Sequence, residues 1–152
     1  LVDITPGRLA APAGTHVSRV TETQGPRDFE SEAHATAYLG KLLSRAPAQV
    51  IEESVRHGMR KLASGRYTWK YDPAVLQRTP GTLDLWEKVK AIPTPTLLQY
   101  GSHSNVVSPE LAEQLRQTMP QCTVDRIDNA GHALFTDQPD AFAASVERFL
   151  GG

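Results

Sequence analysis

The sequence contains a single cysteine, Cys122, among its 152 residues. One thiol cannot close a disulfide within the chain, so the fold cannot depend on a disulfide framework. The five histidines and the cysteine do not follow the spacing of a zinc site either. We therefore expect no metal ion in this protein.

An excess of charge and a long apolar run are also missing. The 16 Lys and Arg residues oppose 17 Asp and Glu residues, a balance that gives no electrostatic attraction to nucleic acid or to an anionic membrane. No apolar run approaches the roughly 20 residues that a membrane-spanning helix needs. Neither nucleic acid nor a membrane is thus an expected partner, and we predict a cytoplasmic location.

The last third of the sequence alternates short apolar runs with amphipathic stretches. Residues 96–100 and 123–127 predict two short strands of a parallel sheet, the first of them buried. Each is followed by a predicted helix, over about 108–119 and about 139–150. This order of strand, loop and helix, repeated once, indicates an α/β architecture with right-handed crossovers.

The beginning of the chain adds one more predicted strand. Leu1-Val2-Asp3-Ile4 is typical of the end of a buried strand, and it breaks at Pro6-Gly7. We expect residues 1–29 to be the end of this core strand and a connecting loop. A strand that begins at the first residue suggests that the sequence continues a larger sheet.

The middle of the sequence is predicted to be mainly helical. Helices are expected from about 31 to 44, from Pro47 onward and from 83 to 90, with a short extended segment at 67–71. We interpret residues 30–90 as an insertion into the α/β core, whose C-terminal part is 91–152.

One histidine stands out by its position. His132 follows the second predicted strand and precedes the last helix, so it lies on a loop between two rigid elements. Gly131 allows the backbone to turn sharply just before it. Such a loop can hold an imidazole firmly while one side of its ring stays accessible.

Together these features resemble the C-terminal half of an α/β-hydrolase. The resemblance is carried by Asp3 after a strand, the helical insertion, the run from Pro95 to Gly101, and Ala130-Gly131-His132 before the final helix. It implies a partial α/β-hydrolase fold, namely the last three strands of a mostly parallel sheet with a helical cap inserted. It also implies an enzyme without a cofactor that acts on a small-molecule substrate.

The resemblance assigns two catalytic roles. Members of the family use a nucleophile, an acid and a histidine in that chain order, and His132 matches the histidine. Many members carry the acid after the strand that matches 96–100, where this sequence has Asn105, which cannot replace a carboxylate. Other members carry it one strand earlier, at the position of Asp3. We favour Asp3 as the acid, and the alternative is a site without an acid.

No Gly-x-Ser-x-Gly motif, which marks the nucleophile in this family, occurs in the sequence. The resemblance places that residue upstream of Asp3. We therefore expect the N-terminal half of the same hydrolase, as a separate chain or a further segment, to be the partner that supplies it.

Five side chains are candidates for substrate contact. The resemblance places three of them beside the catalytic positions and two in the cap: Val106, Leu134 and Phe135, then Tyr38 and Trp69. The cap aromatics have an equally simple alternative role, which is to hold the cap to the sheet.

Three functions are consistent with this resemblance and these candidate residues. The first is hydrolysis of an ester, lactone or related bond by a nucleophile–histidine–acid triad. The second is hydrolysis of an epoxide or a carbon–halogen bond, in which an Asp nucleophile forms an ester with the substrate. The third is a non-catalytic ligand-binding protein on a hydrolase scaffold, which Asn105 would suit.

Overall fold

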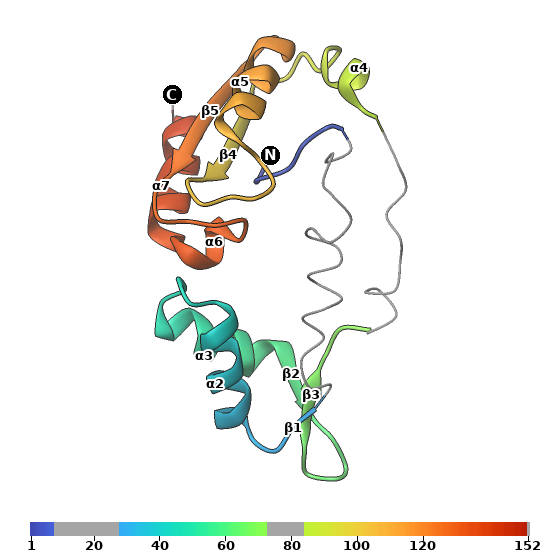
Figure 1. Ribbon diagram of the computed structural model, residues 1–152, viewed down its shortest axis with the longest axis vertical. Helices are drawn as coiled ribbons and strands as arrows, with labels where there is room; N and C mark the ends of the chain where they lie inside the picture. The colour runs from blue at the N-terminus through green and yellow to red at the C-terminus, as the bar shows by residue number, and fades with distance from the viewer. Residues whose placement is uncertain (8–27, 73–83, 152) are drawn as a thin grey trace. The chain divides into compact units, whose positions relative to one another are not determined.

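The computed structural model describes residues 1–7, 28–72 and 84–151, which form two compact units (Figure 1). We call residues 1–7 with 84–151 the core unit and residues 28–72 the inserted unit, and each is considered by itself. The loop expected within 8–27 and the start of the helix expected from 83 fall outside the described residues.

The sheet of the core unit pairs β4 (Thr96–Gly101) with β5 (Cys122–Ile127) in parallel. Parallel neighbours cannot be joined by a tight turn, and here the crossover contains α5 (Pro109–Thr118). Both strands and the crossover helix lie where the sequence predicts them.

Successive side chains of a strand point to opposite faces of a sheet. Each face of this sheet is covered by a helix. On one face Leu98 packs with Leu115 of α5. On the other face Gln99 donates a hydrogen bond of 3.1 Å from Nε2 to the carbonyl of Phe142. Phe142 belongs to α7 (Pro139–Gly151), so α5 and α7 lie on opposite faces of the sheet (Figure 1).

The first residues of the chain run parallel to β4 but form less than a strand. Only Val2 is bridged to the sheet, opposite Gln99. The Gln99 N–H donates to the Leu1 carbonyl at 2.9 Å, and the Asp3 N–H donates to the Gln99 carbonyl at 2.7 Å. The prediction of a strand over residues 1–4 was too long, because Asp3 has a φ of 45° and turns the backbone out of the extended conformation.

The helix ends of the core unit follow local sequence signals. Ser108 caps α5 by accepting a hydrogen bond from the Leu111 N–H at 3.2 Å, and a proline occupies the first turn. Of the helix expected up to residue 90, the described residues form only α4 (Trp86–Val89). A short helix, α6 (Leu134–Asp137), was not predicted because four residues show no helical periodicity.

The inserted unit combines two helices with a small antiparallel sheet. Its helices are α2 (Glu32–Leu42) and α3 (Ala48–Gly58), and Ser31 caps α2 by accepting from the His34 N–H at 3.1 Å. The sheet has the order β1-β3-β2, and the strands are β1 (Asp28–Phe29), β2 (Met59–Lys61) and β3 (Tyr67–Trp69).

The core of the inserted unit is built around Phe29, whose side chain is fully buried. The helix expected from Pro47 onward ends at Gly58, and Met59 begins β2 in an extended conformation. The extended segment expected at 67–71 contains β3, whereas β1 and β2 carry too little alternation to be predicted. No helix of the described residues is long and apolar enough to cross a membrane.

Candidate active site

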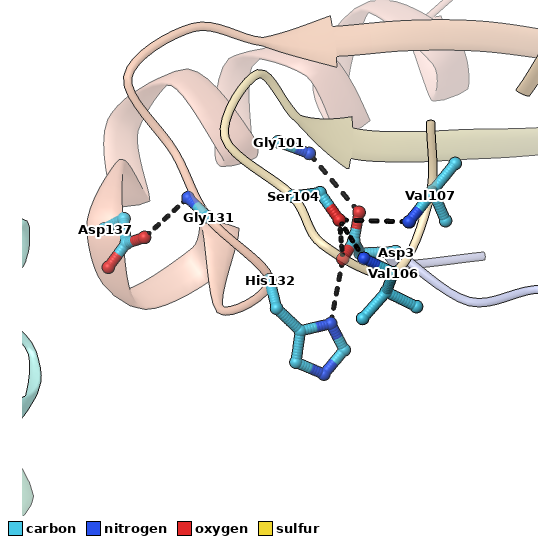
Figure 2. A network of polar contacts seen from close by, with 8 residues as sticks. All are labelled: Asp3, Gly101, Ser104, Val106, Val107, Gly131, His132 and Asp137. Atoms are coloured by element: carbon cyan, nitrogen blue, oxygen red, sulfur yellow. Dashed lines mark hydrogen bonds and ion pairs between the residues drawn. The ribbon is translucent and has the colours of Figure 1, made fainter. Parts of the chain in front are cut away.

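Asp3 is a fully buried carboxylate at the edge of the β4–β5 sheet, with an exposed fraction of 0%. Its N–H is anchored on Gln99, and its φ of 45° lies in the left-handed region that Asp tolerates better than most residues. This turn ends the sheet pairing and leaves the side chain facing the loop that follows β4 (Figure 2). A buried carboxylate requires partners, and Asp3 has several.

His132 is the first of these partners. Its Nδ1 lies 2.8 Å from Oδ2 of Asp3, although 129 positions separate the two residues. The imidazole side chain is 45% exposed, whereas the carboxylate is fully covered. Figure 2 shows Nδ1 facing Asp3 and the opposite side of the ring, with Nε2, turned away from it. In this arrangement the carboxylate of Asp3 holds one side of the imidazole ring, and the geometry suits the far nitrogen for proton transfer.

The loop that carries His132 is fastened on two sides. The Gly131 N–H donates to Oδ2 of Asp137 at 2.7 Å, and Asp137 is itself buried at the end of α6. The His103 N–H donates to the carbonyl of Ala130 at 2.8 Å. The backbone just before the imidazole is therefore held by a carboxylate on one side and by the β4 loop on the other.

The end of β4 touches this loop backbone to backbone. A Cβ atom at Gly101 would lie 2.3 Å from the carbonyl oxygen of Gly131 and 2.4 Å from that of Ala130. Carbon and oxygen atoms cannot approach so closely, so only glycine fits at position 101. The close approach brings the β4 loop and the His132 loop to one place at the edge of the sheet.

Two further groups contact the Asp3 carboxylate. The Gly101 N–H points at Oδ1 from 3.4 Å, and the hydroxyl of Ser104 donates to Oδ2 at 2.7 Å. Ser104 was not among the residues singled out from the sequence. One feature of the sequence could have pointed to Ser104. A serine in a loop commonly accepts hydrogen bonds from backbone N–H groups two or three residues later.

The other candidates in the core unit have different environments. Asn105, the other position considered for the acid, follows Ser104 directly and is exposed. The side chain that lies against Nδ1 of His132 is that of Asp3. Val106 is buried and donates its N–H to the Ser104 hydroxyl at 3.0 Å.

The two apolar candidates next to His132 differ sharply in exposure. Leu134 is fully buried and packs with Ile127 and Ala130. Phe135 is 55% exposed, and its ring lies edge-on to Phe142 with 6.2 Å between centroids. Phe135 therefore offers an accessible apolar surface close in sequence to the imidazole.

Tyr38 and Trp69 belong to the inserted unit, where both are half-buried against its core. Their ring centroids lie 5.4 Å and 5.6 Å from that of Phe29. These contacts give both side chains a role in the packing of their own unit, and substrate contact remains a prediction for them. In the part of the chain that the structure describes, no group of three His, Cys, Asp or Glu side chains could hold a metal ion.

With this geometry in place, comparison with known proteins identifies the fold. The model of the alpha/beta hydrolase family matches residues 3–145. This match spans nearly the whole chain and includes Asp3 and His132. The chain belongs to the α/β-hydrolase family. The expectation drawn from the sequence about family membership is confirmed.

Two curated relatives align along nearly the entire chain. Esterase Rv0045c of Mycobacterium tuberculosis is 31% identical over 158 residues, which cover 99% of this chain and 51% of the esterase. The sn-1-specific diacylglycerol lipase ABHD11 of Mus musculus is 25% identical over 159 residues, covering 99% of this chain and 50% of the lipase. The chain thus spans about half the length of these relatives.

Solved α/β-hydrolase structures agree with this assignment. The crystal structure of Rv0045c superposes with a TM-score of 0.74 at 24% identity, over 100% of this chain and 51% of that one. E-2-(acetamidomethylene)succinate hydrolase gives a TM-score of 0.75 at 20% identity, over 90% of this chain and 50% of that one. These likenesses confirm the fold class, a partial α/β-hydrolase sheet with its helices.

Proposed function

We propose that this chain carries the histidine and the acid of a hydrolase that cleaves an ester, a lactone or a related bond. His132 is the general base and Asp3 the acid that orients it. The observation that supports this assignment is the contact of 2.8 Å between Nδ1 of a half-exposed imidazole and a fully buried carboxylate. The names of the relatives, an esterase and a lipase, agree with it.

The proposed chemistry uses the two ring nitrogens of His132 separately. The Nδ1–H group donates a hydrogen bond to Asp3, which holds the ring and stabilises the imidazolium that forms during the reaction. Nε2 takes the proton of the nucleophile as that group attacks the carbonyl carbon, and then returns it to the leaving group. In the second half of the cycle Nε2 activates water, which releases the acid product and regenerates the nucleophile.

The proposed nucleophile is a serine in polypeptide that precedes Asp3. In this family the chain order is nucleophile, acid, histidine, and the 152 residues contain no Gly-x-Ser-x-Gly motif. The relatives are about twice as long as the aligned chain, which leaves room for such a segment. We further propose that the inserted unit serves as the cap and that Phe135 contributes apolar contact to a small substrate.

A serine-directed fluorophosphonate probe tests this function on the full-length protein. We expect covalent labelling of one serine and hydrolysis of p-nitrophenyl esters. His132→Gln should abolish both, because the nucleophile loses its base, with a loss of turnover on the order of a million-fold by analogy with a serine protease. His57→Gln, which changes an exposed histidine of α3, is the matched control and should behave like the unsubstituted protein.

Three results would contradict the proposal. Ester hydrolysis that survives His132→Gln would remove the histidine from the mechanism. Turnover of epoxides or haloalkanes without fluorophosphonate labelling would point to an aspartate nucleophile instead, and ligand binding without any turnover would point to a non-catalytic role.

A further inference from the structure

We propose that Ser104 is a positioning residue that holds the Asp3 carboxylate in the orientation that accepts from Nδ1 of His132. The inference deepens the proposed function, because it concerns the same site and rests on the roles assigned there to Asp3 and His132. It assigns a task to a side chain that touches the carboxylate rather than the imidazole.

The hydroxyl of Ser104 has all of its hydrogen-bonding capacity in use. A serine hydroxyl has one hydrogen to donate and two lone pairs to accept with. The N–H groups of Val106 and Val107 both donate to Oγ, each at 3.0 Å. With both lone pairs occupied, the single hydrogen points to the remaining neighbour, Oδ2 of Asp3, at 2.7 Å. The direction of this hydrogen bond is therefore determined by the backbone of the loop.

The hydrogen bond from Ser104 to Asp3 also affects the contact between Asp3 and His132. Oδ2 of Asp3 accepts from Ser104, and an oxygen of an ionised carboxylate has no hydrogen of its own to donate. The same oxygen lies 2.8 Å from Nδ1 of His132, so Nδ1 must be the donor of this contact (Figure 2). In the neutral ring one nitrogen carries the hydrogen and the other the lone pair. The lone pair then sits on Nε2, where a general base needs it.

The loop prevents the hydroxyl from turning away. Val107 is 1% exposed and packs in the cluster that contains Leu98 and Leu115, so its backbone is anchored in the core. The Ser104 N–H donates to the Gly101 carbonyl at 2.9 Å, which closes a turn at the other end. Rotation of the Ser104 side chain about χ1 would leave the two backbone N–H groups without their acceptor, which is unfavourable away from water. The loop thus keeps the hydroxyl of Ser104 donating to Oδ2 of Asp3, a contact drawn in Figure 2.

Kinetic measurements on the full-length protein test the proposal first. In Ser104→Ala we expect kcat for ester hydrolysis to fall about tenfold, the effect of losing one hydrogen bond to a charged group, with KM unchanged. Ser104→Thr keeps the hydroxyl and should retain most of the activity. Ser108→Ala is the matched control, because it also removes a hydroxyl that accepts a backbone N–H, at the cap of α5, and has no contact with Asp3.

The tautomer of His132 provides a second readout that does not depend on catalysis. Long-range proton–nitrogen NMR correlations report which ring nitrogen carries the hydrogen. We expect Nδ1–H alone in the unsubstituted protein, in Ser104→Thr and in Ser108→Ala. In Ser104→Ala we expect a mixture of both tautomers, because the carboxylate of Asp3 is then able to turn away from Nδ1. If the protein shows no esterase activity at all, the proposed function fails while the NMR result still decides the role of Ser104.

Ser104→Cys separates loss of the hydrogen bond from a folding defect. Its thiol occupies nearly the same volume as the hydroxyl but is a weak hydrogen-bond donor. A fold-retaining Cys variant should show the same loss of kcat and the same mixture of tautomers. The proposal is overturned if kcat and the tautomer are unchanged in Ser104→Ala or Ser104→Cys. It is equally overturned if kcat falls no more than in Ser108→Ala, or only in proportion to lost folded protein.

Discussion

The two units of this protein differ in what they bury. All the polar or charged side chains that are buried among the described residues belong to the core unit: Asp3, Gln99, Asp137 and Ser145. The buried side chains described in the inserted unit are all apolar: Phe29, Ala35, Leu39, Ile51, Val55 and Met59. Burying a polar group is unfavourable unless a partner satisfies it, so the difference has a structural cause.

In the core unit each of these buried groups has a defined partner, and two of them position the candidate site. Asp3 contacts His132 and Ser104, and Asp137 holds the loop at Gly131. The inserted unit relies instead on contacts between rings around Phe29, which have no donor or acceptor to align. Directional bonds can hold a reacting side chain within tenths of an ångström, whereas apolar packing mainly provides stability. We therefore expect substitutions in the two units to affect different measurements.

The largest expected difference between the two units is in kcat, after one carboxylate charge is removed from each unit. Asp3→Asn should lower kcat about ten-thousand-fold, the effect of the equivalent change in a serine protease, because the amide cannot stabilise the imidazolium. Asp28→Asn removes an exposed carboxylate paired with Arg66 at 2.7 Å and should leave kcat unchanged. Steady-state kinetics of both variants in the full-length protein decide this. Equal losses would show that the two units do not divide their roles in this way.

The stability of the inserted unit should depend chiefly on its central ring. Phe29→Ala should lower the free energy of unfolding by about 3–5 kcal/mol, because it leaves a cavity where a fully buried ring was. Phe135→Ala removes a ring that is 55% exposed and should cost below about 1 kcal/mol. Urea denaturation gives both values. A Phe29→Ala variant as stable as Phe135→Ala would contradict the packing described for this unit.

Glycine is needed for different reasons in the two units. Gly101→Ala should destabilise the core unit by about 1–3 kcal/mol and lower kcat, because the new Cβ would push the His132 loop away from the end of β4. Gly65 has a φ of 84° and open space around it, so Gly65→Ala should cost about 1 kcal/mol through its backbone alone. Its kcat should not change. Thermal unfolding with parallel kinetics separates the two effects, and a Gly101→Ala enzyme with normal kcat would show that the loop contact is dispensable.

The smallest expected effect concerns exposed ion pairs, where the two units should behave alike. Hydrogen bonds from Arg116 and Gln117 lower the pKa of Glu113 from 4.5 to about 2. A lowered pKa contributes stability that is present above pH 4.5 and is lost as the pH falls towards 2. Arg66 lowers the pKa of Asp28 in the same direction.

In Glu113→Gln and in Asp28→Asn, the melting temperature should fall slightly less steeply than in the unsubstituted protein as the pH is lowered. High salt should remove the difference, since these pairs are exposed and screened. Melting temperatures between about pH 5 and pH 2 provide the measurement. A steep change in only one variant would mean that its pair is not an ordinary surface contact.

The elements that could be predicted from the sequence are those with a repeating pattern. The strands at 96–100 and 123–127 and the helices after them were placed within a few residues, because apolar runs and helical spacing of this length are readable. The two-residue strand β1 and the four-residue helix α6 were missed, because so few residues contain no period. Boundaries also moved where a single residue changed the backbone, as Asp3 and Met59 did.

Within the candidate site, the sequence by itself determined the chemical groups. A histidine on a glycine-flanked loop and an aspartate after an apolar run were recognisable, since residue type and local order are properties of the chain. Only the tertiary structure decided that Asp3, and not the exposed Asn105, lies against Nδ1 of His132. It also brought in Ser104, whose bond to the carboxylate spans 101 positions of the chain. Contacts of this kind form when parallel strands end side by side, and no local pattern records that meeting.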